Sequence, residues 1–243
     1  MTETVFREIA GAGLPLVLTH GFGDTSSTWD GQWTGPARRY RAPRWDLPGH
    51  ARSSGDDHPE ACSRNAALAH LDEMIRRVGG DAVLIGHSLG GYLSLCRAVT
   101  RPEGVRGLVL LSTGPGYRNP EARERWNRGV RRIANRFPVP RAATRLVEQH
   151  DDLVIANLAR IRVPVLVLCG ERDLAYHAGM ELLQARLADV RVHLVSGAGH
   201  HPHVSHAAEV QERIEAFLAG PSGARGRGPA EHLATRGSGP EGA

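Results

Sequence analysis

The sequence predicts an α/β fold, in which a mostly parallel sheet is covered by helices on both faces. Two observations support this class. Apolar, strand-like runs alternate along the chain with segments of helical periodicity, and such alternation is typical of parallel strands joined by crossover helices. The chain also has 243 residues and is 41% apolar, which suffices for one α/β domain with an insertion and a tail.

The N-terminal part of the chain supplies the first strands and two helical segments. Residues 14–19 form an apolar run suited to a strand buried on both faces. Leu68, Leu71 and Ile75 recur at helical spacing. In order, the expected elements are a strand at 5–9, a turn at 11–13, a strand at 14–19, a helical segment at 27–40, a short strand at 42–46 and a helix at 61–78.

A serine between glycines follows the next strand, which is expected at 82–86. The sequence there is Gly-His-Ser-Leu-Gly-Gly, residues 86–91, and it opens a helix expected over 92–99. A serine at a strand-to-helix turn, with glycines two residues before and after, is the pattern of a nucleophile elbow. The glycines leave room for close packing, and the strained turn exposes Ser88 Oγ. The alternative is a glycine-rich turn with a helix-capping serine.

The C-terminal half continues the alternation after one interruption. The strand at 107–111 is followed by a break over about 115–160. After it we expect strands at 163–169 and 190–195, a helix that includes 180–187, a helix at 207–218, and a disordered tail at 221–243.

Two of the later strands each lead to a candidate catalytic side chain. Asp173 follows the strand at 163–169, and His200 follows the next one. A nucleophilic serine needs a histidine to take its proton and an acid to orient that histidine. The order serine, acid, histidine is that of folds with a nucleophile elbow, and all three groups would meet at the carboxyl ends of parallel strands. Glu171 is the rival acid, and Asp173 could instead be solvated or cap a helix.

Three further histidines lie close to His200. Clusters that contain His201, His203 and His206 can bind metal, but neither a partner cysteine nor an H-E-x-x-H pattern accompanies them. We therefore expect no metal and no cofactor, and we expect these side chains to be solvated or packed at a helix start. The three cysteines are scattered without C-x-x-C spacing, which favours buried thiols.

Backbone donors for an oxyanion are expected at two places. Leu89 follows the nucleophile, and its N–H group would be one donor. The other would be the N–H group of Phe22 in the sequence Thr-His-Gly-Phe-Gly, residues 19–23. The glycines would let this loop approach the substrate, although an ordinary glycine turn is the alternative.

These motifs, taken in order, resemble the α/β-hydrolase family, in its large subfamily with a helical cap after the sixth strand. The resemblance covers about residues 3–219. The motifs that carry it are His-Gly-Phe-Gly at 20–23, Asp-Leu-Pro-Gly-His-Ala-Arg-Ser at 46–53, and the segments 86–91, 170–173 and 197–200.

The resemblance implies an organisation and a set of roles. Ser88 would be the nucleophile, His200 the base and Asp173 the orienting acid, with Phe22 and Leu89 as oxyanion donors. The expected fold is a mostly parallel eight-stranded sheet flanked by helices. The expected domains are the two parts of the core, 1–114 and 161–220, a short arginine-rich helical cap at 115–160, and the tail at 221–243.

The sequence departs from the family pattern at two places. Ala51 stands where glycine is usual, and the insertion is shorter than the usual four-helix cap. The serine at position 88 also separates the chain from dehalogenases and epoxide hydrolases of this fold, which use an aspartate. Ser88 therefore indicates acyl chemistry through a tetrahedral intermediate.

The insertion is the candidate substrate region. Residues 116–145 hold nine arginines against two glutamates, a local charge of +7. Residues 120–137 predict a helix with an apolar stripe on one face. The stripe would either roof an acyl pocket or pack on the core, and the arginines would either bind an anionic group or be solvated. The expected pocket residues are His20, His87, Trp126, Val130 and Ile133; Phe137 completes the stripe.

The sequence thus predicts a serine hydrolase of carboxylic esters, in enzyme class 3.1.1, acting on a small-molecule acyl substrate. The alternatives are cleavage of a carbon–carbon bond in a dienoate-type dione, thioester hydrolysis, a lyase or cyclase reaction, and a binding module that keeps the triad. All 30 basic residues are arginine, which reflects compositional bias, so we expect no nucleic-acid partner. Without a signal peptide or an apolar run of membrane length, we expect a cytoplasmic protein that does not bind membranes.

Overall fold

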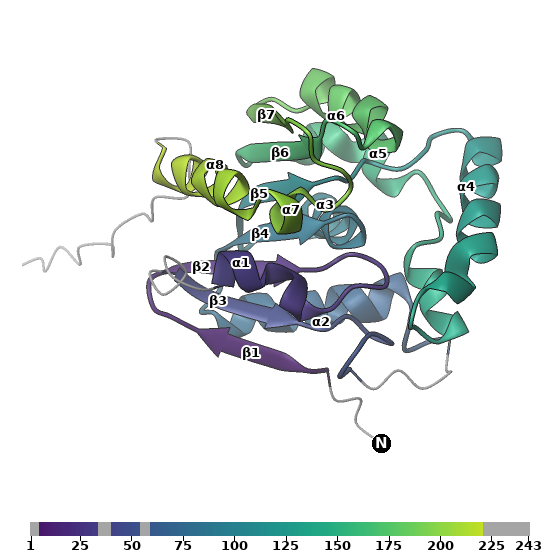
Figure 1. The fold of residues 1–243 in the computed structure, drawn as a ribbon, viewed down its shortest axis with the longest axis horizontal. Helices are drawn as coiled ribbons and strands as arrows, with labels where there is room; N and C mark the ends of the chain where they lie inside the picture. The colour runs from purple at the N-terminus through teal and green to yellow at the C-terminus, as the bar shows by residue number, and fades with distance from the viewer. Residues whose placement is uncertain (1–4, 34–39, 54–58, 221–243) are drawn as a thin grey trace, which may run out of the picture.

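A seven-stranded sheet forms the centre of the protein in the computed structural model, which describes residues 5–33, 40–53 and 59–220 (Figure 1). The strand order is β1-β3-β2-β4-β5-β6-β7. Only β1 is antiparallel to its neighbour, and the other neighbouring pairs are parallel. The strands are β1 (Arg7–Ala10), β2 (Leu14–Thr19), β3 (Tyr40–Trp45), β4 (Ala82–His87), β5 (Val105–Leu111), β6 (Val165–Gly170) and β7 (Val190–Val195).

The predicted fold class is confirmed, but the predicted count of eight strands is wrong for the described residues. The number eight came from the family resemblance, whereas the sequence itself contains seven strand-like runs, each of which forms a strand. The insertion accordingly follows the fifth observed strand, β5, and not a sixth.

Helices occupy the segments between the strands. The α-helices are α1 (Asp30–Trp33), α2 (Arg64–Arg77), α3 (Leu89–Thr100), α4 (Pro120–Ile133), α5 (Leu153–Asn157), α6 (Leu174–Arg186), α7 (Pro202–Ser205) and α8 (Ala207–Ala219). Short 3-10 helices are η1 (Ser26–Trp29), η3 (Ala134–Arg136), η4 (Arg141–Leu146) and η5 (Leu158–Arg160). Within the described ranges, no helix combines the length and the hydropathy that crossing a bilayer requires.

Two helical predictions were too long. In the segment expected at 27–40, the described residues up to Trp33 are helical but Tyr40 belongs to β3; residues 34–39 lie outside the described residues. The helix expected at 120–137 ends at Ile133 and continues as η3, and Phe137 is extended. Pro138 explains this end, because a proline disfavours helical geometry in the residue before it. The expected tail at 221–243 also lies outside the described residues.

The sheet separates two hydrophobic clusters, as alternation along a strand requires. In β5, Leu108 and Leu110 join the cluster beneath α2, α3 and α6, whereas Val109 and Leu111 join the cluster beneath η1 and α8. Helices therefore cover both faces, as the sequence predicted. Cys62, Cys96 and Cys169 are all free and buried, which confirms the expected thiols.

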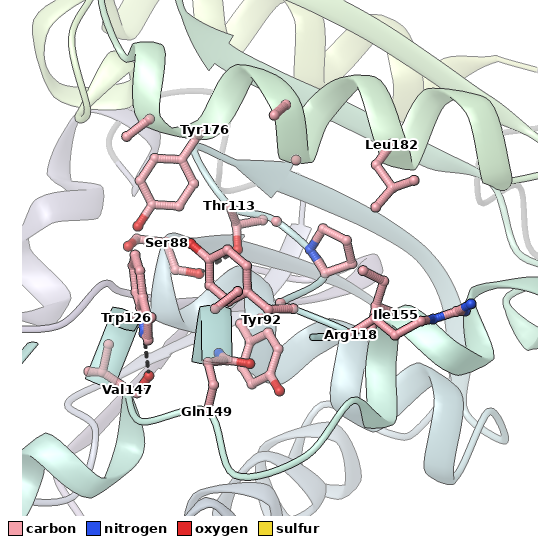
Figure 2. A pocket seen from close by; sticks show the side chains of 18 of the residues that line it. Ser88, Tyr92, Thr113, Arg118, Trp126, Val147, Gln149, Ile155, Tyr176 and Leu182 are labelled. Atoms are coloured by element: carbon pink, nitrogen blue, oxygen red, sulfur yellow. Dashed lines mark hydrogen bonds between the residues drawn. The ribbon is translucent and has the colours of Figure 1, made fainter. Parts of the chain in front are cut away.

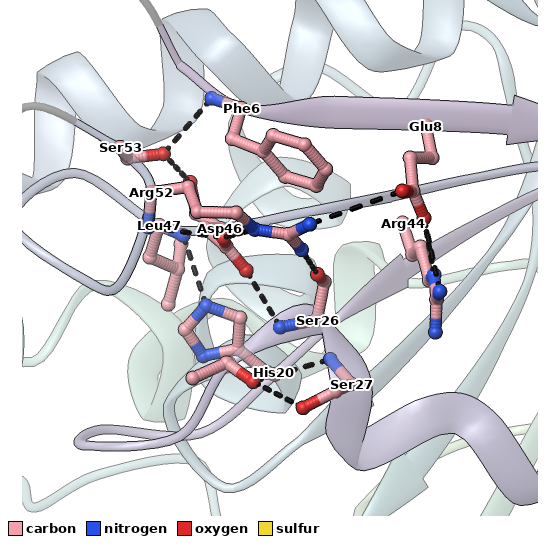
Figure 3. Close-up of polar contacts among 11 residues, drawn as sticks. Phe6, Glu8, His20, Ser26, Ser27, Arg44, Asp46, Leu47, Arg52 and Ser53 are labelled. Carbon is pink, nitrogen blue, oxygen red and sulfur yellow. Dashed lines mark hydrogen bonds and ion pairs between the residues drawn. The ribbon is translucent and has the colours of Figure 1, made fainter.

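The Asp46–Ser53 motif holds the N-terminal elements together (Figure 3). The buried carboxylate of Asp46 accepts hydrogen bonds from Ser26 N at 2.7 Å and from Arg52 Nε at 3.0 Å. The Arg52 guanidinium stacks over the ring of Phe6, and Ser53 Oγ accepts from the backbone N–H of Phe6 at 3.1 Å. These contacts join the end of β3 to η1 and to the segment before β1, so this motif stabilises the fold.

The position of Ala51 explains why glycine is usual there. Its φ is 44°, in the left-handed region that a side chain disfavours. Ala51 therefore adopts a backbone conformation that favours glycine.

Candidate active site

Ser88 occupies the sharp turn between β4 and α3 that the sequence predicted. Its φ of 50° and ψ of −112° are sparsely populated for a residue with a side chain. A Cβ atom at Gly86 would lie 2.4 Å from the backbone of Gly90, and one at Gly90 would lie 2.2 Å from the carbonyl oxygen of Thr19. Both positions therefore require glycine, and the close packing forces Ser88 into its strained conformation. The strained strand-to-helix turn that the sequence predicted is therefore present at Ser88.

The structure brings Ser88, His200 and Asp173 together from three loops at the carboxyl ends of strands. His200 Nδ1 lies 2.9 Å from Asp173 Oδ2, and His200 Nε2 lies 3.1 Å from Ser88 Oγ. A carboxylate only accepts, so Nδ1 carries the proton and donates to Asp173. In the neutral imidazole Nε2 is then the acceptor, and Ser88 Oγ–H donates to it. This arrangement can remove the proton of Ser88.

The two rival acids have different partners. Asp173 sits at the N-cap position of α6 but makes no side-chain capping bond, so its carboxylate is available to His200. Glu171 instead accepts from Gly197 N at 2.7 Å and from Ser196 Oγ at 3.1 Å. Burial alone would raise the pKa of Asp173, but the hydrogen bond and the charge of His200 outweigh it and hold that pKa below its usual range. Asp173 is therefore the acid that geometry places behind His200.

The two predicted oxyanion donors lie at the start of α3 and in the turn after β2. Leu89 is the first residue of α3, so its N–H group has no acceptor within the helix. Phe22 lies in the turn closed by the hydrogen bond from Asp24 N to Gly21 O at 3.3 Å. A Cβ atom at Gly21 would lie 2.7 Å from His87 Nδ1, so this loop packs directly against the residue before the nucleophile.

A cavity of about 340 Å³ opens above Ser88 (Figure 2). Its wall is mostly apolar and includes residues from α3, α4, α5 and α6. Trp126 is fixed in this wall by a hydrogen bond from its Nε1 to Val147 O at 3.0 Å. The buried side chain of Gln149 is a polar element of the same wall. Such a pocket can hold an apolar acyl chain with a few oriented polar groups.

Only Trp126 among the five expected pocket residues lines this cavity. His20 is fully buried beside it, where Nδ1 contacts Gly21 O at 2.7 Å and Nε2 accepts from Leu47 N at 2.9 Å. His87 is also buried, and its Nε2 lies 2.8 Å from His200 O.

The apolar stripe after Trp126 does not continue as the roof of the cavity. Val130 is buried but is not part of the cavity wall. Ile133 is 40% exposed. Phe137 packs edge-on against Phe22, with 5.1 Å between the ring centroids. The stripe therefore divides between the cavity, the interior of the insertion and the loop of Phe22.

The arginines of the insertion lie mostly outside the cavity. Among the described residues, Arg118 is the one arginine in the wall, and Figure 2 shows its side chain beside Ile155. Arg128 and Arg132, in contrast, are exposed on α4. An anionic group on a substrate would therefore meet Arg118 before either of them.

Tyr176 is a site residue that the sequence analysis missed. Its ring stacks on His200 with centroids 4.8 Å apart, and its side chain lines the cavity above Ser88. Burial raises the pKa of Tyr176 to about 12, although its hydrogen bond with Ser88 acts in the opposite direction. Tyr176 follows Asp173 by three residues, and an aromatic residue so close to the acid was the available signal.

In the histidine-rich segment, His203 is packed at the start of α7, as the sequence predicted, whereas His201 contacts a carboxylate. His201 is not simply solvated, because its Nε2 lies 3.2 Å from each oxygen of Asp24. His203 is buried and its Nε2 contacts Thr28 Oγ1 at 3.0 Å. Among the described residues, Asp24, His87 and His201 form the one group whose possible metal-ligand atoms lie within 4.8 Å of one another.

A family model described as "Alpha/beta hydrolase family" matches residues 16–213. Similar curated proteins include the pimeloyl-[acyl-carrier protein] methyl ester esterases of Nitrosomonas europaea and Xanthomonas campestris. The first is 27% identical and the match covers 83% of this chain and 94% of the relative. The second is 29% identical, with coverage of 87% and 98%.

Solved structures show the same fold. MenH from S. aureus aligns with a TM-score of 0.77 at 21% identity, over 90% of this chain and 98% of that protein. A thermophilic esterase from Thermogutta terrifontis aligns with a TM-score of 0.75 at 23% identity, over 88% and 92%. Because one fold hosts many reactions, these likenesses establish architecture and leave the reaction to be argued from the site.

Proposed function

Because the chain belongs to the alpha/beta hydrolase family, we propose that it is a serine hydrolase that cleaves a carboxylic ester through an acyl-enzyme intermediate. The observation that carries this proposal is the hydrogen-bonded series Ser88–His200–Asp173, with Ser88 facing the cavity. The esterase names of the curated relatives support an ester as the bond that is cleaved.

In the first half-reaction, Ser88 Oγ attacks the ester carbonyl carbon while its proton passes to His200 Nε2. The carbonyl electrons move to oxygen, and the N–H groups of Leu89 and Phe22 stabilise the resulting oxyanion. Collapse of this intermediate expels the alkoxide, which takes the proton from His200 and leaves as the alcohol. Asp173 stabilises the imidazolium that forms meanwhile. The product is an acyl group on Ser88.

In the second half-reaction, water replaces the alcohol. His200 takes a proton from the water, and the hydroxide attacks the acyl carbon. The same two N–H groups hold the second oxyanion. Ser88 then leaves with the proton of His200, and a carboxylic acid is released. The enzyme returns to its starting protonation without a cofactor.

The cavity supports a substrate with an apolar acyl chain. Its volume of about 340 Å³ lies near the lower end of the range for small-molecule sites, and the wall offers Trp126 and Leu182 to a chain that extends from Ser88. Arg118 at this wall supports a carboxylate or another anionic group on that substrate. The exposed arginines of α4 would suit an anionic carrier of the acyl group, such as the acyl-carrier protein in the names of the relatives.

The proposed function is tested with a fluorophosphonate probe and a substrate panel. The probe should add one phosphonyl group to the wild-type chain and none to Ser88→Ala. The panel contains p-nitrophenyl esters of increasing chain length, a thioester and a dienoate-type dione. Faster turnover of esters than of the other two classes is expected. Dione cleavage that exceeds ester cleavage would replace the ester proposal with carbon–carbon bond hydrolysis.

A separate variant tests whether Arg118 binds an anionic group of the substrate. Arg118→Ala should raise KM for an ester whose acyl chain ends in a carboxylate and leave KM for the neutral ester of equal length unchanged. Arg128→Glu combined with Arg132→Glu is the matched control, because both residues are exposed and neither lines the cavity. An equal effect of Arg118→Ala on both esters would exclude a role in binding the anion.

A further inference from the structure

Three loops meet at the carboxylate of Asp24, behind the proposed catalytic groups. Asp24 itself follows β2, in the loop whose Phe22 N–H group is the proposed oxyanion donor. His87 is the last residue of β4 and directly precedes Ser88. His201 directly follows His200 in the loop after β7. The side chains of these two histidines both face Asp24.

The contact with His201 fixes one side of the histidine loop. His201 Nε2 lies 3.2 Å from both Asp24 Oδ1 and Asp24 Oδ2. Equal distances to the two oxygens fit one N–H group shared between them. The bond with Asp24 also raises the pKa of His201, so that the pair is ionic over a wider pH range.

His87 fixes the other side of the same loop. Its Nε2 lies 2.8 Å from the carbonyl oxygen of His200, which only accepts, so His87 donates this bond. Its Nδ1 lies 3.2 Å from Asp24 Oδ2 but carries no proton in the neutral ring, so this approach is not a hydrogen bond. The side chain of His87 is 1% exposed, so water does not compete for its hydrogen bond with His200 O.

We propose that Asp24 is a positioning residue, whose carboxylate joins the oxyanion loop to the histidine loop and thereby fixes the position of His200. The carbonyl oxygen of His200 accepts a hydrogen bond from His87, and the next residue, His201, is bonded to Asp24. Its imidazole needs this support because Ser88 and Asp173 lie in the loops after two different strands, β4 and β6. Asp24 touches none of the reacting atoms and acts through His201, the residue after His200. This inference rests on the proposed serine hydrolase function.

A divalent cation is the competing occupant of this cluster. Asp24, His87 and His201 offer ligand atoms within 4.8 Å of one another, and two histidines with a carboxylate are a known metal-ligand set. A metal would need an unprotonated Nε2 on His201, about 2.0–2.1 Å from the ion. The shared N–H geometry between His201 and both oxygens of Asp24 favours the proton instead.

Asp24→Asn tests the positioning role, because it keeps the shape of the side chain and removes its charge and one acceptor. The turnover number is measured with a p-nitrophenyl ester and is referred to the fraction of Ser88 that the fluorophosphonate probe titrates. We expect kcat per titrated site to fall about 100-fold, the loss that a misplacement of about 1 Å causes. KM should stay within about twofold, because Asp24 is not part of the cavity wall.

Two further variants keep the test decisive if Asp24→Asn does not fold. His201→Gln removes the ion pair at a side chain that is 44% exposed, so the fold should survive and kcat should again fall with KM unchanged. His206→Gln lies in the same segment but outside the cluster, and it should keep the wild-type kcat. Unchanged kcat in both Asp24→Asn and His201→Gln would overturn the proposal.

The outcomes separate this inference from the function on which it rests. A wild-type chain that hydrolyses no ester and takes up no probe contradicts the proposed function. Wild-type turnover that Asp24→Asn leaves intact contradicts the positioning role alone. Loss of activity after dialysis against a chelator, with recovery on adding Zn²⁺, would overturn the hydrogen-bonded cluster in favour of a metal site.

Discussion

At the scale of single residues, two neighbouring acids differ in what they can do for His200. Asp173 faces His200 Nδ1, whereas Glu171 is held by Gly197 N and Ser196 Oγ. Asp173→Asn should therefore lower kcat by about 10⁴-fold, because an amide no longer stabilises the required tautomer and the imidazolium. Glu171→Gln should keep kcat within about twofold. Steady-state kinetics of the two variants measures this, and a larger loss in Glu171→Gln would reverse the assignment.

The sequence located the triad because its members follow strands in a fixed order. It could not tell which way side chains beside a motif point. His20 adjoins the turn after β2 and His87 adjoins the nucleophile elbow, yet both are buried, hydrogen-bonded and absent from the cavity wall. The sequence analysis missed Asp24 and Tyr176 because their partners, His201 and His200, are distant in sequence and come close only in the folded chain.

At the scale of elements, the turn after β3 carries a strain that one substitution should relieve. Ala51 has a φ of 44° and an exposed side chain, and the left-handed region costs a residue with a Cβ atom about 1–2 kcal/mol. Ala51→Gly should raise the free energy of unfolding by about 0.5–1 kcal/mol, after the entropy that glycine loses. Urea unfolding measures the change, and a destabilised variant would mean that the turn does not store this strain.

At the nucleophile elbow, in contrast, replacing a glycine by alanine should destabilise the protein. A Cβ atom at Gly90 would lie 2.2 Å from Thr19 O, which is backbone and cannot move away alone. Gly90→Ala should therefore destabilise the protein by about 1–3 kcal/mol and reduce probe labelling of Ser88. Gly129→Ala is the matched control, because nothing lies within 4 Å of its added atom in α4. That variant should be stabilised by about 0.5–1 kcal/mol. Thermal unfolding of both distinguishes the two outcomes.

Element positions were well predicted wherever periodicity and a breaker agreed. β7 has the predicted bounds, and β2 does as well. α4 ended early because Pro138 acts on Phe137, an effect of one residue on its neighbour that the apolar spacing does not show. The segment at 27–40 was predicted as one helix because its composition does not reveal that Tyr40 pairs with β2 as a strand.

At the scale of the whole molecule, buried histidines should make stability depend on pH. Burial lowers the pKa of His20 to about 4 and that of His203 to about 2, and it also lowers the pKa values of His50 and His87. The unfolded chain, with histidines near 6.5, binds more protons in this range. The contribution of these histidines to the free energy of unfolding is therefore fully present above pH 6.5 and is lost as pH falls toward 4. His201 has a raised pKa and acts in the opposite direction.

Urea unfolding between pH 7 and pH 4 tests this dependence. Each buried neutral histidine contributes up to about 1.4 kcal/mol per pH unit, so the free energy of unfolding should fall steeply below pH 6.5. Asp24 and Asp173 do not account for such a fall. Their pKa values are lowered from 3.8, so their contributions are lost only below that pH. A constant free energy of unfolding from pH 7 to pH 4.5 would contradict the buried, neutral state of these histidines.

The general architecture was predictable because an α/β sheet follows from alternation alone. The two faces of β5 illustrate this, since neighbouring residues enter different clusters. The cavity was less predictable. Its walls come from α3, α4, α5 and α6 together, and the packing of the insertion depends on long-range contacts such as the reciprocal hydrogen bonds between Asn127 and Gln149.

Covalent catalysis by Ser88 is the central claim, and trapping the acyl-enzyme tests it most directly. Wild-type protein is mixed with a p-nitrophenyl ester, quenched in acid within the first turnovers and analysed by intact mass and peptide mapping. We predict a mass increase equal to one acyl group, located on the peptide that contains Ser88, and a burst of p-nitrophenol of matching size. Ser88→Ala should show neither. Ester turnover without an adduct, unchanged in Ser88→Ala, would contradict the mechanism.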